Sequence, residues 1–451
     1  MEEMTRLEME PERVDGNQYT NLRQFLVELN EADIAACMDE LSDEDELKVF
    51  RILPKDLAAD VFSYLEIENQ EMIITALTDK ETANIINNLM ADDAADLLEE
   101  MPANVVKKLL KNAAPEVRND INHLLKFPEN SAGSLMTVEY VDLKEHLTVS
   151  QAIDRIRKIG VDSETINNCY VLDNQRKLIG TVTLRHLLLS GADDIIGDIM
   201  TENVIAVNTL MDQEEVANQF KKYDFISMPV VDNEDRLVGI ITVDDIVDIL
   251  EEEATEDMEM MAAIVPGDKP YMRTSVYENF KKRIPWLLLL MVSSAFTGAI
   301  ITSFEEALSV NAALIAFIPM LMGTGGNAGG QASVTIIRGL SMGEIEYREV
   351  PGIMRKEIRV AFFCGICLAI ANFGKLMLFD RIGVMVAFAV SLTLVVVVLM
   401  AMLIGCVLPV LAKRIGFDPA VMASPFITTI VDAMSLLIYF RVAMIVLGIT
   451  V

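Results

Sequence analysis

The chain has 451 residues and a formal net charge of −31 at pH 7, and this charge is unevenly distributed. Residues 284–451 contain 10 Lys and Arg against 9 Asp and Glu, whereas residues 1–283 contain 27 basic and 59 acidic residues, a net charge of −32. An acidic surface repels phosphate, so a nucleic-acid partner is excluded and cations are favoured. A well-solvated acidic protein of the cytosol is the other explanation that the charge leaves open.

Tandem helical repeats are predicted for the first domain, residues 1–131. The segments 41–65 and 77–101 align at an offset of 36 residues, which places Asp43 on Asp79. Each segment opens with Ser-Asp or Thr-Asp, which is a helix-start signal, and breaks midway before a second helix. Helical repeats complete one another's core, so we expect an all-α helical-repeat domain.

A change of pattern near residue 132 predicts two smaller α/β domains, 132–198 and 199–250. In each copy, two runs rich in β-branched residues flank a polar turn and lead into a helix. These runs are 167–173 and 177–183 in the first copy, and 226–232 and 236–250 in the second. A Leu-Met-Thr or Ile-Met-Thr segment precedes each pair of runs.

This tandem resembles a pair of CBS domains, a module that senses ligands. CBS pairs often bind adenine nucleotides through a Thr-x-x-Asp that contacts the ribose. The second copy keeps this pattern in Thr242 and Asp245, whereas the first copy has His186 at the position of the acid. The resemblance therefore implies at most one nucleotide site, for ATP, with Thr242 and Asp245 as contacts.

A membrane domain is predicted for residues 284–451, after a connecting helix and linker at 251–283. Pro266 and Gly267 should end the connecting helix. Five apolar segments each have the roughly 20 residues that a bilayer crossing needs. They lie at about 285–304, 312–336, 360–379, 384–411 and 420–448. We therefore expect a multidomain membrane protein whose last domain is a five-helix transmembrane pore.

Basic residues in the short loops predict the orientation of these spans in the cell membrane. Lys and Arg concentrate on one side, which marks it as cytoplasmic. They are Lys281, Lys282, Arg283, Arg338, Arg348, Arg355, Lys356, Arg359, Lys413 and Arg414. The opposite loops hold only Arg381. The acidic half of the chain is therefore expected in the cytoplasm, and the C-terminus outside.

The second span carries a run of small and polar residues, GTGGNAGGQ, at 323–331. Small residues let helices approach closely, and a loosened helix frees carbonyls that can face a cavity or an ion. Helix packing alone is the simpler explanation. Asn327 and Gln331 beside the glycines favour a polar pathway, with Gly325, Gly326 and Asn327 along it.

Asp432 lies well inside the fifth span. A carboxylate at the bilayer centre costs roughly 2.5–3.5 kcal/mol on insertion scales, so it should face a wet cavity or a cation. A structural ion pair with Arg441 is the alternative, although nine residues place the two on about opposite faces of a helix. Asp418 precedes Asp432 by fourteen residues, nearly four turns. We therefore expect both carboxylates on one face of one helix, at the two ends of an ion path.

The residue types along this path favour a hard cation. Carboxylates and carbonyls suit Mg²⁺ and Ca²⁺, and no cluster of Cys and His is present that would select a soft metal. Mg²⁺ dehydrates reluctantly, so one acidic position that acts through water suits it. This chemistry leaves Ca²⁺ and Mn²⁺ open.

The order of domains and the membrane motifs together resemble the MgtE family of magnesium transporters. The motifs are the run at 323–331 and the spacing from Asp418-Pro419-Ala420 to Asp432. The resemblance implies a homodimer in membrane lipid, a pore lined by the second and fifth spans, and hydrated Mg²⁺ near Asp432. It also implies CBS domains that dimerise and a connecting helix that plugs the pore.

The resemblance further implies regulatory Mg²⁺ sites between acidic surfaces of the cytosolic part. Matched motif by motif, the metal residues are Asp60, Asp92, Asp96, Glu214, Asp224, Asp245, Asp248, Glu253, Glu256 and Asp257, together with Asp418 and Asp432 in the membrane domain. Two carboxylates about 4 Å apart repel by about 4 kcal/mol at an effective dielectric of 20. Such surfaces close only when divalent ions lie between them, so high cytosolic Mg²⁺ should close the pore.

Other functions remain as alternatives. A CBS-regulated transporter of Mn²⁺, Co²⁺ or another solute would share the same domain order. An enzyme is not expected, because the sequence contains no paired nucleophile and base, no phosphate-binding loop and no cofactor fingerprint.

Overall fold

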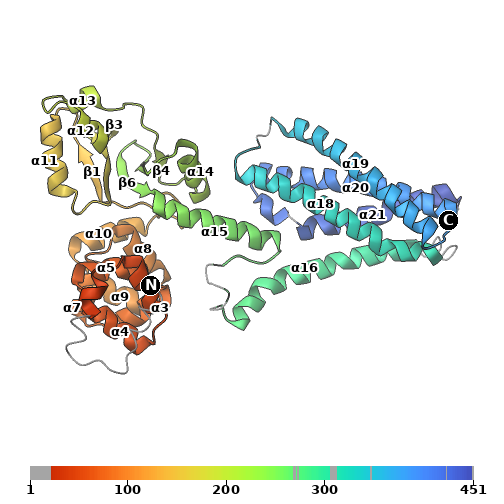
Figure 1. The fold of residues 1–451 in the computed structure, drawn as a ribbon, viewed down its shortest axis with the longest axis horizontal. Coiled ribbons are helices and arrows are strands. Elements are labelled where there is room, and N and C mark those ends of the chain that lie inside the picture. The colour runs from red at the N-terminus through yellow and green to blue at the C-terminus, as the bar shows by residue number, and fades with distance from the viewer. Residues whose placement is uncertain are drawn as a thin grey trace. The chain divides into compact units, whose positions relative to one another are not determined.

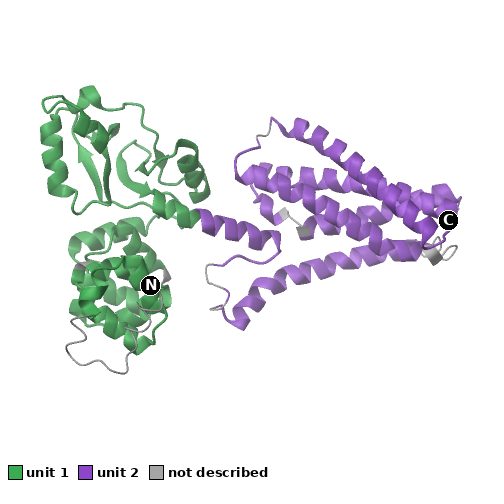
Figure 2. Cartoon of the chain, viewed as in Figure 1, with its two compact units in different colours: residues 1–249 green, residues 250–451 purple. Residues whose placement is uncertain are grey.

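The computed structural model describes residues 22–267, 271, 274–304, 312–345, 348–422 and 424–448. Contacts divide the chain into two units, residues 1–249 and 250–451, which Figure 2 draws in green and purple. Unit 1 contains the helical and α/β domains, and unit 2 contains the long apolar helices (Figure 1).

Short helices form the first part of unit 1, as the repeat pattern predicts. They are α3 (Glu31–Asp39), α4 (Asp43–Ile52), α5 (Lys55–Ser63), α6 (Ile67–Ala76), α7 (Asp79–Ile86), α8 (Ala91–Glu100), α9 (Ala103–Asn112) and α10 (Pro115–Leu124). The pairs α4–α5 and α7–α8 lie 36 residues apart, at the predicted offset. Thr78 begins the second pair with a capping box, in which its hydroxyl and the Glu81 carboxylate satisfy each other's backbone N–H groups.

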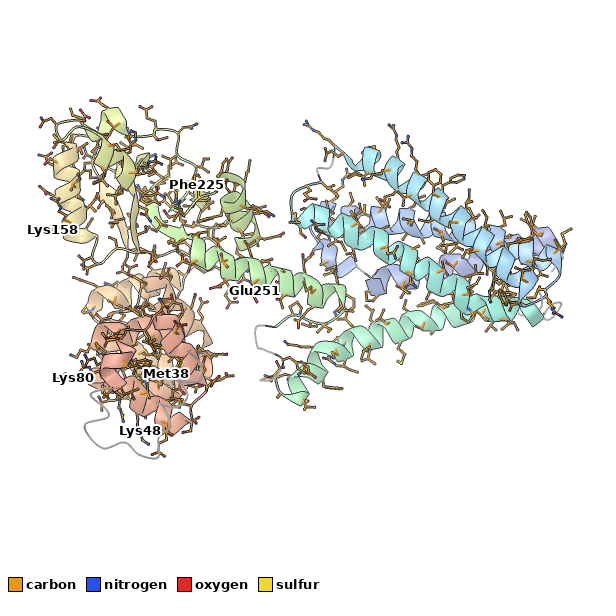
Figure 3. All side chains as sticks on the ribbon, viewed as in Figure 1. Met38, Lys48, Lys80, Lys158, Phe225 and Glu251 are labelled. Atoms are coloured by element: carbon orange, nitrogen blue, oxygen red, sulfur yellow. The ribbon has the colours of Figure 1, made fainter. Side chains whose placement is uncertain are left out.

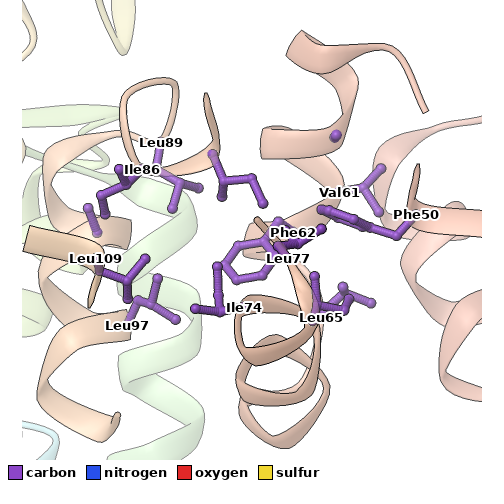
Figure 4. Close-up of a cluster of buried hydrophobic side chains, with 14 of the residues drawn as sticks. Phe50, Val61, Phe62, Leu65, Ile74, Leu77, Ile86, Leu89, Leu97 and Leu109 are labelled. Carbon is purple, nitrogen blue, oxygen red and sulfur yellow. The ribbon is translucent and has the colours of Figure 1, made fainter. Parts of the chain in front are cut away.

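Alternate helices of this domain stack on one another: α3 contacts α5, α5 contacts α7, and α7 contacts α9. Their inward faces supply one apolar core, part of which Figure 4 shows around Phe62, Ile74 and Leu109. Phe50 and Phe62 meet edge to face with ring centroids 6.0 Å apart. Neighbouring repeats thus bury each other's apolar faces, and the all-α helical-repeat prediction is confirmed.

Two three-stranded sheets follow, in the order expected for the α/β pair. The first copy contains β1 (Tyr140–Leu143), α11 (Val149–Ile159), β2 (Thr165–Leu172), β3 (Leu178–Thr183), α12 (Leu184–Leu189) and α13 (Ile196–Ile199). The second contains β4 (Val207–Asn208), α14 (Gln213–Tyr223), β5 (Ser227–Val231), β6 (Leu237–Thr242) and α15 (Val243–Met261). In each sheet the first strand pairs parallel with the second, and the second pairs antiparallel with the third.

The turn between the paired antiparallel strands has the same geometry in both copies. Asp173 Oδ1 accepts the backbone N–H groups of Gln175 and Lys177, and Asp232 Oδ1 does the same two and four residues later. These are Asx-type turns, in which an aspartate replaces the backbone carbonyl. The two predicted turns are therefore confirmed.

The repeated Met-Thr segments cross from one copy to the other. Thr137 exchanges backbone hydrogen bonds with Ile240 of β6, at 2.8 and 2.9 Å, and Thr201 does so with Thr181 of β3. A Cβ on Gly180 would lie 2.5 Å from Met200 Sδ, so glycine leaves room for that side chain in its present position. Gly239 accommodates Met136 in the same way. The exchange joins the two copies into one body.

Unit 2 contains long helices at the predicted spans. They are α16 (Val276–Ser303), α18 (Ile318–Ser341), α19 (Val350–Leu378), α20 (Val384–Arg414) and α21 (Ser424–Leu447), with the short 3-10 helices η2 (Ala312–Phe317) and η3 (Pro419–Met422). Four of them, α16, α19, α20 and α21, are long and apolar enough to cross a membrane. The glycine-rich α18, which corresponds to the second predicted span, has the length but is not among those four, so a membrane crossing by α18 remains a prediction.

α18 packs against both α20 and α21. A Cβ on Gly405 of α20 would lie 2.2 Å from the carbonyl oxygen of Gly329 in α18. A Cβ on Gly329 would in turn lie 2.9 Å from Ile427 Cγ2 of α21. The glycines of α18 therefore allow close helix packing, as small residues do in membrane helices.

Within unit 2, the end of α15 lies against the membrane helices. Met260 and Met261 pack with Ile337 of α18 and Ala420 of η3. α15 ends at Met261, five residues before Pro266, and Ala263 follows in a left-handed conformation with φ of 56°, so the connecting helix ends earlier than the predicted break at Pro266 and Gly267.

Candidate functional site

A groove of about 610 Å³ runs along α18 beside α21. Its wall is mainly apolar, with several polar side chains among the glycines. The lining residues are Met322, Gly323, Gly326, Asn327, Gly330, Gln331, Val334 and Thr335 of α18, and Thr428 and Asp432 of α21. Gly326, Asn327 and Asp432, which the sequence predicts along an ion path, therefore come together in one groove. The side chains of Asn327 and Gln331 are exposed, as groove-lining amides should be.

Asp432 supplies the one carboxylate of this groove lining. Its Oδ1 atom is buried, and it has no hydrogen-bond partner in the part of the chain that the structure describes. The Arg441 side chain is exposed, so the structure gives no support to a compensating ion pair. An unpartnered carboxylate oxygen beside this groove is suited to receive a cation or its water shell.

Gly325 is not among the residues that line the groove. A Cβ at this position would lie 2.9 Å from Ser435 Oγ, Val397 Cγ1 and Val431 Cγ1, so the residue packs against α20 and α21. Neighbouring helix positions differ by about 100° in direction, which separates Gly325 from Gly326. The structure thus assigns Gly325 to helix packing rather than to the ion path.

The prediction that Asp418 and Asp432 share a face of one helix is wrong. Pro419–Met422 form the separate 3-10 helix η3, and α21 begins only at Ser424. Asp418 Oδ1 accepts the backbone N–H of Ala420 at 2.6 Å and so begins that short turn. Pro419 and Pro425 cannot donate backbone hydrogen bonds, which explains why the helix does not continue back to Asp418.

Asp418 instead lies near Asp257 of α15, within unit 2. Burial is the largest cause that raises the pKa of Asp257. The negative charge of Asp418 raises it further, and that of Glu253 contributes less. A hydrogen bond with Ser341 acts in the opposite direction. Three predicted metal residues, Glu253, Asp257 and Asp418, therefore share one acidic neighbourhood at the end of the membrane helices.

A second acidic neighbourhood lies within unit 1, where α8 meets the beginning of α15. Burial raises the pKa of Asp92 well above its usual value, and the charges of Asp93, Asp245 and Glu164 raise it further. Burial and the charges of Asp245, Asp244, Asp60 and Glu139 raise the pKa of Asp93 to about 6. Carboxylates that lie close together and are partly shielded from water disfavour one another's ionisation, which raises their pKa values.

Glu164, just before β2, takes part in the same neighbourhood. Burial and the charges of Asp244, Asp245, Asp93 and Glu139 raise its pKa to about 7. The sequence predictions contain Asp60, Asp92 and Asp245 of this group but not Asp93, Glu139, Glu164 or Asp244. Asp93 and Asp244 were recognisable as neighbours of predicted acids. Glu139 and Glu164 stand in no motif, and only the folded chain brings them here.

The other predicted metal residues lie on several elements. Asp96 of α8 and Asp248 of α15 are exposed. Glu214 is in the first turn of α14, and Asp224 follows that helix in a left-handed conformation, with φ of 53°. Glu253 and Glu256 belong to the part of α15 in unit 2. These positions are spread over unit 1 and the end of α15.

Among the described residues, no three His, Cys, Asp or Glu form a group that could hold a metal ion. The acidic neighbourhoods are therefore surfaces of charge rather than complete ligand shells. Thr242 and Asp245, the predicted nucleotide contacts, hydrogen-bond to each other, with Thr242 Oγ1 2.8 Å from Asp245 Oδ2. Thr242 is buried at the end of β6, so a ligand would first meet Asp245.

Three family models match this chain, and together they account for most of it. The model of a divalent cation transporter, MgtE, matches residues 318–442. The MgtE intracellular N domain matches residues 29–130, and the CBS domain matches 132–192 and 196–252.

Relatives of similar length are known. The magnesium transporter MgtE of Thermus thermophilus is 36% identical over 430 residues, which cover 94% of this chain and 95% of the relative. That of Bacillus subtilis is 33% identical, with 94% and 93% covered. A crystal structure of the soluble part of a magnesium transporter is 31% identical, with a TM-score of 0.53, and covers 56% of this chain and 99% of the solved one. The cytosolic domain of the Mg²⁺ channel MgtE in complex with ATP is 38% identical, with a TM-score of 0.49, and covers 52% and 95%.

Proposed function

Since the chain belongs to the MgtE family of magnesium transporters, we propose that it moves Mg²⁺ into the cytoplasm as a channel. The ion passes along the groove between α18 and α21. The observation that carries this proposal is the buried Oδ1 of Asp432, which has no partner among the described residues and lines that groove. A negative charge at this depth is costly unless a cation compensates for it.

The composition of the groove suits a hydrated Mg²⁺ ion. One carboxylate, two exposed amides and two hydroxyl groups, from Asp432, Asn327, Gln331, Thr335 and Thr428, can accept or donate hydrogen bonds to bound water. Mg²⁺ keeps several of its waters in proteins and needs few direct protein ligands. Mn²⁺ and Co²⁺ are the alternative cargo, because both accept oxygen ligands in similar geometry.

Growth of a bacterial strain that requires added magnesium tests the transport proposal. Expression of this chain should restore growth at low Mg²⁺, and Asp432→Ala should abolish the rescue. Asp380→Ala is the control, because Asp380 pairs with Lys375 at 3.0 Å and is not among the residues that line the groove. Rescue by Asp432→Ala at a normal protein level would refute the assigned path, and uptake of Mn²⁺ or Co²⁺ without rescue at low Mg²⁺ would favour the alternative cargo.

We further propose that cytosolic Mg²⁺ closes the channel through the two acidic neighbourhoods. Each gathers carboxylates whose charges oppose ionisation of their neighbours. Divalent ions relieve this repulsion, so Mg²⁺ favours the state in which the acidic surfaces lie together. A shift from 1:99 to 99:1 between two states requires about 5.5 kcal/mol of differential binding, which several weak sites can supply together.

Replacement of Asp92, Asp96 and Asp245 by Ala tests this regulation. The triple variant should conduct and yet fail to close when Mg²⁺ rises on the cytosolic side of a membrane patch. A matched triple variant of exposed acids, Asp33→Ala, Asp162→Ala and Asp193→Ala, should close normally. Normal closing of the first variant would refute the regulatory role.

The remaining proposals concern assembly and ligands of the whole molecule. We propose a homodimer in the cell membrane, with the acidic half in the cytoplasm and the C-terminus outside. The domains are 1–131, 132–198, 199–250, 251–283 and 284–451. ATP is proposed to bind beside Asp245, whose carboxylate Thr242 already holds in place. Loss of ATP binding in Asp245→Asn, measured by calorimetry without Mg²⁺, would support this contact.

A further inference from the structure

A basic groove lies on the helical-repeat domain, in a half of the chain whose net charge is −32. Its volume is about 580 Å³. The lining residues are Met101, Ala103, Val106, Lys107, Leu110, Lys111 and Arg118, from α9, α10 and the end of α8. Within residues 103–118 the chain has four Lys and Arg and a single Glu, a net charge of +3. The groove is thus a basic site in strongly acidic surroundings.

The cations of this groove differ in how firmly they are held. Arg118 Nη2 donates to the carbonyl groups of Lys111 and Ala113, at 3.2 and 2.9 Å. Its Nε is buried and has no partner among the described residues. Lys107 and Lys111 stand one turn apart on α9, are exposed, and form no ion pair with the described part of the chain. The guanidinium is therefore fixed at the base, and two free ammonium groups flank it.

Several other cations of unit 1 take part in contacts that hold the fold together. Lys108 of α9 donates to the carbonyl groups of Ile74 and Leu77 at 2.8 and 2.7 Å. Arg157 pairs with Asp154 at 3.1 Å, and Lys48 pairs with Glu44 and Asp45. The groove differs from these sites in leaving positive charge for a ligand.

The groove also has an apolar floor, and this determines the class of ligand. Met101, Val106 and Leu110 lie beside the cations at the edge of the domain core, to which Leu109 of α9 also belongs (Figure 4). A small hydrated anion such as phosphate would neutralise the positive charges but leave the apolar floor exposed to water. An acidic peptide with interspersed apolar side chains satisfies both parts of the groove.

We propose that residues 1–21 of this chain occupy the groove. This segment lies outside the described residues, and its sequence has six Asp and Glu against two Arg, a net charge of −4. Its acids alternate with Met4, Leu7 and Met9, which match the apolar floor. The acidic surface of unit 1 repels this negatively charged segment, whereas the positive charge of the basic groove attracts it.

The length and attachment of the segment favour this occupant over a separate protein. Twenty-one residues reach roughly 70 Å when extended, whereas a domain of about 100 residues has a radius of gyration near 13 Å. A tethered ligand acts at an effective concentration of about millimolar, so modest contacts suffice. The proposal is independent of the transported ion and adds a docking site to the regulatory half of the chain.

Amide hydrogen exchange of the full chain in detergent tests this proposal. Amides of residues 1–21 should exchange about tenfold more slowly in the native chain than in Lys107→Glu/Lys111→Glu. Exposed Lys55 and Lys80 (Figure 3 labels Lys80) provide the control, because neither lines the groove. Lys55→Glu/Lys80→Glu should leave the protection unchanged.

A charge exchange makes the test specific. Glu8→Lys/Glu10→Lys should abolish the protection, and combination with Lys107→Glu/Lys111→Glu should restore it. Fast exchange of residues 1–21 in the native chain, or protection that survives charge reversal of the groove, would overturn the proposal. Equal loss in the Lys55→Glu/Lys80→Glu control would also overturn it, because the effect would then reflect overall charge.

Discussion

The groove of unit 2 and the acidic neighbourhood of unit 1 use the same chemical group in opposite ways. Asp432 is the one carboxylate in the lining of its groove, and its Oδ1 has no partner among the described residues. Burial, and then the charges of neighbouring acids, raise the pKa values of Asp92, Asp93 and Glu164. A single carboxylate can attract a hydrated ion and release it. A group of carboxylates remains together only when cations or protons neutralise it, so its arrangement follows their concentration.

The largest effect on stability is expected where α18 and α20 touch. Gly405→Ala places a Cβ against the Gly329 carbonyl, where the gap is 2.2 Å, and should cost about 1–3 kcal/mol through forced helix displacement. Thermal unfolding in detergent measures the change. Gly298→Ala on α16 meets no atom within 4 Å and should have little effect, which gives a matched control. Equal melting temperatures for the two variants would contradict close packing as the basis of the groove wall.

The next effect concerns the amide that faces Asp432's groove. Asn327→Leu removes a polar wall group and should reduce Mg²⁺ flux about tenfold, the equivalent of one hydrogen bond of about 1.4 kcal/mol. Flux into proteoliposomes, measured with a Mg²⁺-sensitive dye, provides the number. Phe363→Leu, at an exposed position of α19, should conduct normally. An unaffected flux in Asn327→Leu would place the ion path elsewhere.

The stability of the acidic neighbourhood in unit 1 should depend on pH. In unit 1, folded-state pKa values of about 6 for Asp93 and about 7 for Glu164 exceed the usual values of about 4. The folded state therefore binds more protons, and stability falls as pH rises from about 4 through 7. Without Mg²⁺, the hydrogen-exchange protection factors of amides in α8, which correct for the faster intrinsic exchange at higher pH, should be several-fold smaller at pH 8 than at pH 5. Added Mg²⁺ should raise them at pH 8, and protection factors independent of both pH and Mg²⁺ would contradict the account.

The smallest expected effect concerns Glu46, a carboxylate whose pKa is raised mainly by burial rather than by neighbouring acids. Burial is the main cause that raises the pKa of Glu46 in α4 to about 7, with smaller contributions from Asp39 and Asp43. The residue is 2% exposed, and its Oε1 has no partner among the described residues. Glu46→Gln should raise the melting temperature by a few degrees at pH 8, and this gain should disappear as the pH falls below about 4.5, the usual pKa of the carboxyl group. This gain should be the same with and without Mg²⁺; a gain that Mg²⁺ removes would indicate a metal site at Glu46.

Local signals in the sequence predict much of the fold. The capping residue Thr78, the turn residue Asp173 and the 36-residue offset act through neighbouring residues, so the helical repeats and hairpins follow from them. The crossing of Met136 and Met200 between the two α/β copies depends on contacts far apart in the sequence. Such pairing has no local signal, and only the folded chain reveals it.

The sites are predicted to a lesser degree. A carboxylate in an apolar run identifies Asp432 directly, and polar neighbours identify Asn327. Helical periodicity fails for Asp418, because Pro419 and Pro425 separate it from α21. Glu164 was missed because a single glutamate before a strand carries no signal until folding brings it near Asp92.

Mg²⁺ flux through purified protein in liposomes tests the central claim most directly. The native chain should pass Mg²⁺ down its gradient, and Asp432→Asn should reduce the initial rate about a hundredfold, because the cation loses roughly 3 kcal/mol of stabilisation at the buried position. Asp380→Asn should retain the native rate. Undiminished flux in Asp432→Asn would contradict the account, because the ion would then cross the membrane without this carboxylate.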